Sequence, residues 1–180
     1  IRNNGLADVV AGTDKRSQEP LLGKALGLID EAAGSIREAA EGADLVVVAV
    51  PVKATRDVLE ELRPWLGKNA ILTDVGSTKT SFVEDVKAVF GGLSANVIPG
   101  HPIAGSEKSG IRAASPTLFT NHKVILTPAD AVAESNVARL KALWEGCGAT
   151  VLTMSVAYHD EVLAATSNLP HLIAFSLVDT

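Results

Sequence analysis

The sequence predicts an α/β protein with a doubly wound, Rossmann-like and mostly parallel sheet, followed by the start of an all-α domain. Short β-branched runs alternate with longer helical patterns, which is typical of parallel strands joined by crossover helices. The run at 45–50 is apolar throughout, as expected for a strand covered on both faces. We place the domain boundary after residue 154, which leaves 155–180 as the start of the helical domain.

Apolar periodicity defines the elements in order. Within 54–66, for example, Val58, Leu62 and Trp65 recur at helical spacing, and Trp65 and Trp144 are expected in the core. Ser155 is a suitable N-cap for the last helix, and Pro170 is expected to kink it. The expected strands are 9–14, 45–50, 70–75, 96–99, 123–127 and 150–153, and the expected helices are 54–66, 82–90, 133–146 and one after Ser155.

The first residues look like the end of a helix. Residues 1–6 fit the last turn of a helix that closes at Gly5. In a doubly wound fold such a helix follows a first strand and a glycine-rich loop, whose backbone donors bind a pyrophosphate. We therefore expect that strand and that loop to be missing from the given sequence.

Composition limits the classes of partner. The 180 residues carry a formal net charge of −5, and their Lys and Arg residues are scattered, so a nucleic-acid partner is not expected. No apolar run reaches membrane-spanning length, and no secretory signal is visible. The single Cys147 cannot form an internal disulfide, which favours the cytoplasm. The histidines and this cysteine lack metal-ligand spacing, so no metal site is expected.

The segment 101–110, of sequence HPIAGSEKSG, is the strongest candidate for a functional site. Histidine is the side chain whose unperturbed pKa lies nearest working pH, so His101 can accept a proton from a hydroxyl group and return it. Gly100 permits a close approach by another group, and Pro102 favours an extended backbone at His101. A second polar loop, 74–79 of sequence DVGSTK, precedes it.

Asp14 ends the expected strand 9–14. An acid at this place in a dinucleotide-binding fold accepts hydrogen bonds from the adenosine ribose hydroxyls, which favours NAD. Lys15, Arg16 and Ser17 follow directly and suit a ribose phosphate, so NADP stays open. An Asp that starts a surface turn is the structural alternative.

These motifs, together with His159-Asp160 and Leu169-Pro170-His171 on the last helix, resemble the prephenate dehydrogenase family, which includes arogenate and cyclohexadienyl dehydrogenases of tyrosine biosynthesis. The resemblance spans nearly the whole chain. It implies NAD(P)-dependent oxidative decarboxylation of prephenate to 4-hydroxyphenylpyruvate. It also implies a homodimer formed through a C-terminal helical domain.

The resemblance also implies roles for single residues. His101 matches the catalytic histidine, and Ser77 matches a serine near the nicotinamide and the substrate hydroxyl. His171 matches a substrate-contacting histidine, while the family often has another histidine where this chain has Asn168, which cannot titrate. We add as substrate-binding candidates Glu107 and Lys79, and as cofactor-binding candidates Asp14, Val50, Pro51 and Ser77.

Several alternatives stay open at this point. Ser77 is equally suited to cap the following helix, Lys79 to lie solvated in its first turn, and His159 to make a structural hydrogen bond. An arogenate dehydrogenase would share the chemistry, whereas a general hydroxyacid dehydrogenase would need a catalytic lysine on the interdomain helix. A nucleotide-sensing module without turnover would need no proton acceptor such as His101.

Overall fold

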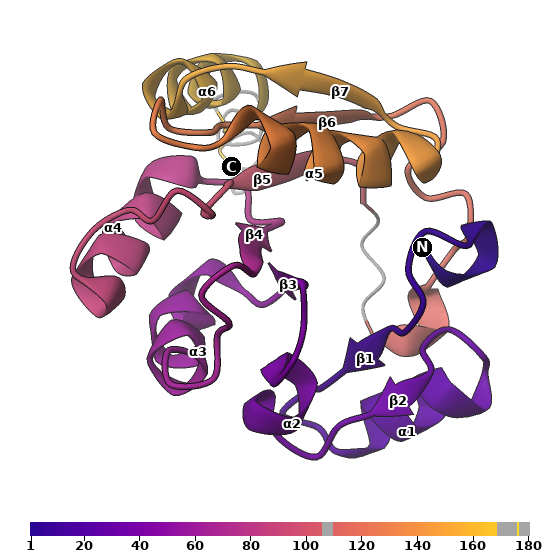
Figure 1. Cartoon of the computed structure of the whole chain (residues 1–180). Coiled ribbons are helices and arrows are strands. Elements are labelled where there is room, and N and C mark those ends of the chain that lie inside the picture. Colours follow the sequence, from indigo (N-terminus) through magenta and orange to yellow (C-terminus); the bar gives the residue numbers. More distant parts are fainter. Residues whose placement is uncertain (106–109, 169–175, 177–180) are drawn as a thin grey trace.

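A computed structural model describes residues 1–105, 110–168 and 176. Three groups of paired strands form its sheets (Figure 1). The parallel pairs are β1 (Ala11–Gly12) with β2 (Glu31–Ala32), and β3 (Leu45–Val48) with β4 (Ile71–Asp74); in the third group β6 (Lys123–Leu126) pairs antiparallel with β5 (Gly100–Ile103) and parallel with β7 (Thr150–Thr153).

Helices connect the strands and cover both faces of the β3–β4 pair. They are α1 (Gln18–Ala25), α2 (Ile36–Ala40), α3 (Thr55–Leu62), α4 (Lys79–Phe90), α5 (Glu134–Gly146) and α6 (Val156–Leu163). Successive β4 residues alternate between two cores: Leu72 packs with residues of α2, α3 and α4, and Ile71 packs with residues of α5. The predicted doubly wound α/β class is confirmed by this arrangement.

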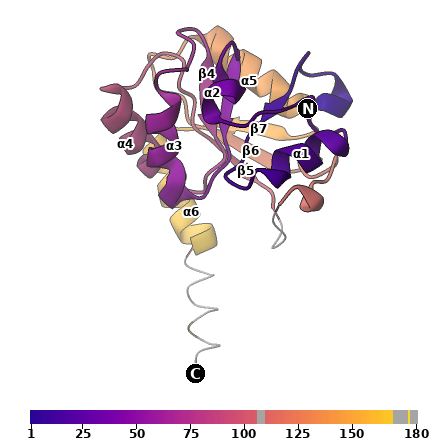
Figure 2. The same ribbon diagram turned by 90° about the horizontal axis from the view of Figure 1, so that it is seen from below.

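The last helix starts as predicted. The side chain of Ser155 accepts a hydrogen bond from the backbone N–H of Tyr158 at 3.2 Å, which caps α6. α6 packs against α4 and projects from the edge of the α/β domain (Figure 2). A π-helical turn, Ala164–Asn168, continues it. Pro170 and its expected kink lie outside the described residues, and the domain boundary stays a prediction.

The sequence predictions were wrong in two regions. The expected strand 96–99 makes only an isolated parallel bridge, Val97 to Leu72, and the hydrogen-bonded strand is β5, which contains His101 itself. The elements between residues 17 and 41, α1, β2 and α2, were not predicted, because they are short and bury few residues. At the start of the chain a 3₁₀ helix, Arg2–Asn4, does end at Gly5 with φ 62°, as expected.

Candidate active site

The loop after β4 and the start of β5 meet at one edge of the sheet. Val97 runs parallel to β4, so the chain reaches Gly100 and His101 just beyond the end of that strand. A β-carbon at position 100 would lie 2.9 Å from the carbonyl oxygen of Asp74, so only glycine fits there without a shift. The close approach predicted for Gly100 is therefore made by the β4 backbone.

A buried ion pair fixes this junction. Lys79 is fully buried and Asp74 is 4% exposed, and the Lys79 ammonium donates to the Asp74 carboxylate and to the Gly100 carbonyl oxygen, the latter at 2.7 Å. The same carboxylate accepts hydrogen bonds from the backbone N–H groups of Gly76 at 2.9 Å and Gly100 at 3.1 Å. Both backbone polar groups of Gly100 are thus bound, which sets the backbone position of the adjacent His101.

The His101 side chain is held from α6. Its Nδ1 lies 2.9 Å from Nε2 of His159, and Nδ1 of His159 lies 2.7 Å from Oδ1 of Asp160. His159 is fully buried, whereas His101 is half-buried. Among the described residues, Nε2 of His101 has no hydrogen-bond partner, so this nitrogen is available to a ligand.

Asp160 also caps α4. Its Oδ1 and Oδ2 accept the backbone N–H groups of Lys79 and Thr80, each at 2.9 Å. A carboxylate at a helix N-terminus is favoured by the unpaired N–H groups and the helix dipole. Because Asp160 fills this role, Ser77 does not cap α4, and the exposed Ser77 hydroxyl has no hydrogen-bond partner within the described part of the chain.

The network shifts the ionisation of its members. Burial, then the nearby His159 and Lys79, lower the pKa of His101 to about 4, while Asp160 opposes them. Burial disfavours the charged form of Asp160, but hydrogen bonds from the Thr80 side chain, from the two backbone N–H groups and from His159 outweigh it and lower its pKa. His101 is therefore neutral at pH 7 beside an ionised Asp160.

The predicted cofactor residues follow the ends of two other strands. Asp14 comes two residues after β1, with a side chain 38% exposed; its Oδ1 accepts the backbone N–H of Arg16 at 2.8 Å, and Oδ2 has no partner among the described residues. Arg16 lies 3.4 Å from Asp14 and 3.8 Å from Glu19, so two acids offset its charge. Val50 and Pro51 follow β3, half-buried and exposed respectively.

One prediction is corrected and two lie outside the described residues. Lys79 is neither solvated nor open to a substrate, because burial and its bonds to Asp74 and Gly100 give it an internal structural role. Glu107 and His171 belong to segments that are not described. The role of Asp160 was missed, because sequence spacing does not show that it contacts α4 some 80 residues earlier.

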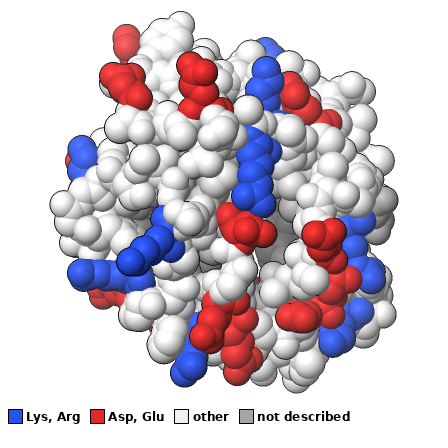
Figure 3. All heavy atoms as spheres, in the orientation of Figure 1, with Lys and Arg blue, Asp and Glu red and all other residues white. Residues whose placement is uncertain are grey.

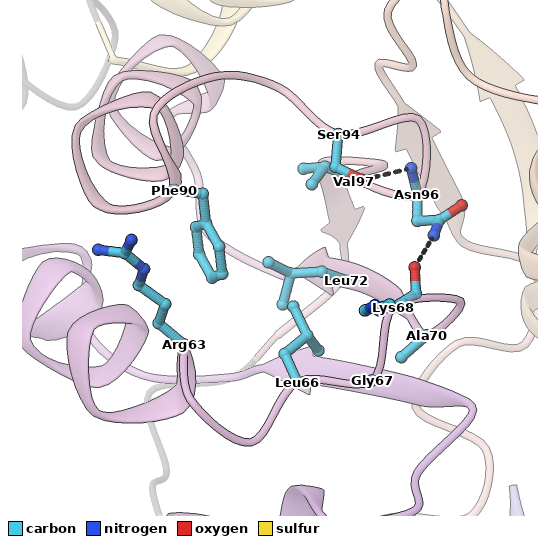
Figure 4. Close-up of a pocket in the computed structure, with 10 residues that line it drawn as sticks. All are labelled: Arg63, Leu66, Gly67, Lys68, Ala70, Leu72, Phe90, Ser94, Asn96 and Val97. Atoms are coloured by element: carbon cyan, nitrogen blue, oxygen red, sulfur yellow. Dashed lines mark hydrogen bonds between the residues drawn. The ribbon is translucent and has the colours of Figure 1, made fainter.

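Other surface features do not contribute to this site. A cavity of about 280 Å³ lies at the opposite, amino-terminal end of β4, between the ends of α3 and α4; Figure 4 shows its lining, in which the Asn96 amide donates to the Lys68 carbonyl oxygen. Basic and acidic residues are interspersed on the face shown in Figure 3. The described residues contain no metal-binding cluster of His, Cys, Asp or Glu, and none of their helices is long and apolar enough to span a membrane.

The doubly wound fold, with polar side chains after the strand ends, defines a nucleotide-binding α/β domain of the dehydrogenase type. Residues 1–153 match the family model described as "Prephenate dehydrogenase, nucleotide-binding domain". The chain belongs to the prephenate dehydrogenase family, and the resemblance seen in the sequence is confirmed.

Individual relatives agree with this assignment. The chain is 40% identical to cyclohexadienyl dehydrogenase of Zymomonas mobilis over 86% of this chain and 52% of the relative, and 36% identical to prephenate dehydrogenase of Bacillus subtilis over 99% and 48%. It spans about half the length of these relatives. The crystal structure of prephenate dehydrogenase from Aquifex aeolicus superposes with a TM-score of 0.89 at 35% identity, covering 99% of this chain and 63% of the other.

Proposed function

We propose that this chain forms the nucleotide-binding domain of an NAD-dependent prephenate dehydrogenase. The observation that carries the proposal is His101, whose neutral imidazole has no hydrogen-bond partner at Nε2 among the residues that the structure describes, and which lies close to the loop that bears Ser77. A solved relative at 35% identity is described as a complex with hydroxyphenyl propionate and NAD+, and the first of these is a hydroxyphenyl compound like the expected product.

The residues present fit the cofactor. Asp14 offers ribose hydroxyls a carboxylate oxygen that has no partner in the described part of the chain, and the acids beside Arg16 disfavour an added phosphate. This favours NAD over NADP. Val50, Pro51 and the exposed Ser77 hydroxyl complete the proposed contacts. When bound, NAD accepts the hydride from the substrate.

The proposed reaction balances without a further reactant. The ring carbon that bears the hydroxyl loses a hydride while the hydroxyl proton moves to Nε2 of His101, which leaves a ring carbonyl. The bond to the ring carboxylate then breaks, carbon dioxide leaves, and the electron pair of that bond makes the ring aromatic and the oxygen a phenolate. His101 returns its proton to this oxygen, and Ser77 orients it by a hydrogen bond.

The test is a steady-state assay of the whole protein with prephenate or arogenate and with NAD or NADP, following formation of the reduced cofactor. We expect the highest kcat/KM with prephenate and NAD. A preference for arogenate supports the alternative substrate, and NAD binding without turnover of either compound supports a nucleotide-sensing module.

The whole protein is proposed to be a cytoplasmic homodimer that dimerises through helices of its C-terminal domain. The projection of α6 away from the α/β domain supports this assembly (Figure 2). Light scattering of the whole protein measures the mass in solution, and a monomer at working concentration would contradict the proposal.

A further inference from the structure

We propose that His159 and Asp160 are positioning residues that fix the proton of His101 on Nδ1 and so keep Nε2 as the proton acceptor. The inference rests on the proposed function for the identity of the reaction, and the hydrogen-bonded chain from His101 through His159 to Asp160 supports the proton arrangement. It gives a role to a buried histidine and an acid that the proposed reaction does not otherwise use.

With both histidine rings neutral, the hydrogen bonds allow one placement of the ring protons. An ionised carboxylate only accepts hydrogen bonds, so Nδ1 of His159 must donate to Asp160 across their 2.7 Å contact. The inference includes a neutral His159, whose Nε2 accepts the hydrogen bond that Nδ1 of His101 donates across 2.9 Å. A neutral His101 with its proton on Nδ1 has its lone pair on Nε2.

Asp160 can impose this order because it cannot easily turn. Two backbone N–H groups at the start of α4, those of Lys79 and Thr80, hold its two oxygens at 2.9 Å. The fully buried His159 ring is bound at both nitrogens, and it meets the His101 ring edge to face at 5.1 Å. Asp160 is therefore fixed by the N-terminus of α4, whereas His101, the residue that it orients through His159, lies in β5.

The same arrangement supports the charge that forms during turnover. When Nε2 of His101 takes the hydroxyl proton, the imidazolium keeps its Nδ1 hydrogen bond to His159, and the nearby Asp160 carboxylate stabilises the positive charge. The Lys79 ammonium opposes that charge, and Asp160 is the group that favours it. Loss of the carboxylate is expected to weaken the proton affinity of His101.

The first test is Asp160→Asn in the whole protein, with Glu161→Gln as the matched control. Glu161 is the next residue of α6 and is exposed, so its substitution removes the same charge from the same turn. An asparagine amide that donates to Nδ1 of His159 reverses both tautomers and places a proton on Nε2 of His101. We expect kcat to fall about 10²-fold or more with the KM for NAD little changed, and the acidic limb of the kcat/KM profile to move to lower pH.

The second measurement is independent of activity. Long-range proton–nitrogen NMR of histidine-labelled whole protein reports which ring nitrogen of His101 carries the proton. We expect Nδ1–H in the unsubstituted protein and in Glu161→Gln, and Nε2–H in Asp160→Asn. Nε2–H in the unsubstituted protein overturns the inference; Nδ1–H there together with absence of any turnover overturns the proposed function instead.

If Asp160→Asn does not fold, two substitutions of His159 test the same inference. His159→Gln keeps an oxygen acceptor for Nδ1–H of His101, whereas His159→Leu removes it at similar size. We expect the glutamine variant to keep at least tenfold more kcat than the leucine variant. Equal kcat in the two variants, or an Asp160→Asn enzyme equal to Glu161→Gln in rate and pH profile, overturns the inference.

Discussion

The two ends of the candidate site are built differently. His101 is held by groups from β4, α4 and α6: a buried ion pair binds its neighbour Gly100, and His159, itself bound to the Asp160 carboxylate, binds its ring. Within 1–105 and 110–168, Asp14 is held only by its own turn, through the backbone N–H and side chain of Arg16, and it is exposed.

This difference separates two tasks. A proton acceptor must keep its tautomer and direction, and buried hydrogen bonds from several elements provide that constraint. A residue that contacts ribose hydroxyls needs only reach and charge, which an exposed turn provides. Substitutions around His101 should therefore affect stability or turnover strongly, and substitutions around Asp14 should affect cofactor preference mildly.

The largest effect is expected for His101→Asn. Loss of the base should lower kcat by about 10³-fold, within the usual range for general-base catalysis, with NAD affinity little changed. Steady-state kinetics and NAD titration of the whole protein measure both. An equal loss of turnover and NAD binding would indicate a structural histidine instead.

Lys79→Met tests the buried pair. It leaves the Asp74 carboxylate buried without its ammonium partner, so the free energy of unfolding should fall by about 3–5 kcal/mol. Chemical denaturation measures this value. Lys87→Met, at an exposed position of the same helix, serves as control and should change it by less than about 0.5 kcal/mol. Similar losses in both variants would show that the pair adds little.

Gly100→Ala tests the close approach of β5 to β4. The new methyl group meets the Asp74 carbonyl oxygen at 2.9 Å, so we expect a loss of about 1–3 kcal/mol in the free energy of unfolding and reduced turnover. Gly92→Ala is the control, because its methyl group meets no atom within 4 Å. If both variants unfold alike, the junction tolerates movement.

Asp14→Ala tests the exposed end. Loss of a charged acceptor should weaken NAD binding about tenfold and NADP binding less, without loss of stability. Titration with each cofactor measures the preference. Asp8→Ala, which removes an exposed acid before β1, should leave both affinities unchanged. An unaltered preference in Asp14→Ala would remove this residue from the ribose contact.

The last prediction concerns acid stability. The pKa of His101 is about 4 in the folded protein, below its ordinary value of 6.5, so the unfolded chain takes up this proton first as the pH falls. The contribution of His101 to the free energy of unfolding is therefore present above pH 6.5 and is lost as the pH falls toward 4. Unfolding curves of His101→Asn should therefore depend less on pH in this window, and curves parallel to those of the unsubstituted protein would contradict the shift.

The sequence predicted the local parts of this architecture well. Strands with apolar runs, the N-cap Ser155 and the helix end at Gly5 were found because their signals lie within a few residues. The family motifs also led to the choice of His101 and Ser77 as site residues, and their roles stay predictions. Contacts between distant segments were not predictable, so Lys79 was taken for a ligand contact and Asp160 was given no role.

A crystal structure of the whole protein with NAD and a non-reacting 4-hydroxyphenyl ligand would test whether Nε2 of His101 accepts the proton of the substrate hydroxyl. The quantity to measure is the distance from Nε2 of His101 to the ligand hydroxyl oxygen. We expect about 2.6–3.2 Å, with Nδ1 still bound to His159. A His101 ring turned away from the ligand, or separated from the hydroxyl by more than one water molecule, would contradict it.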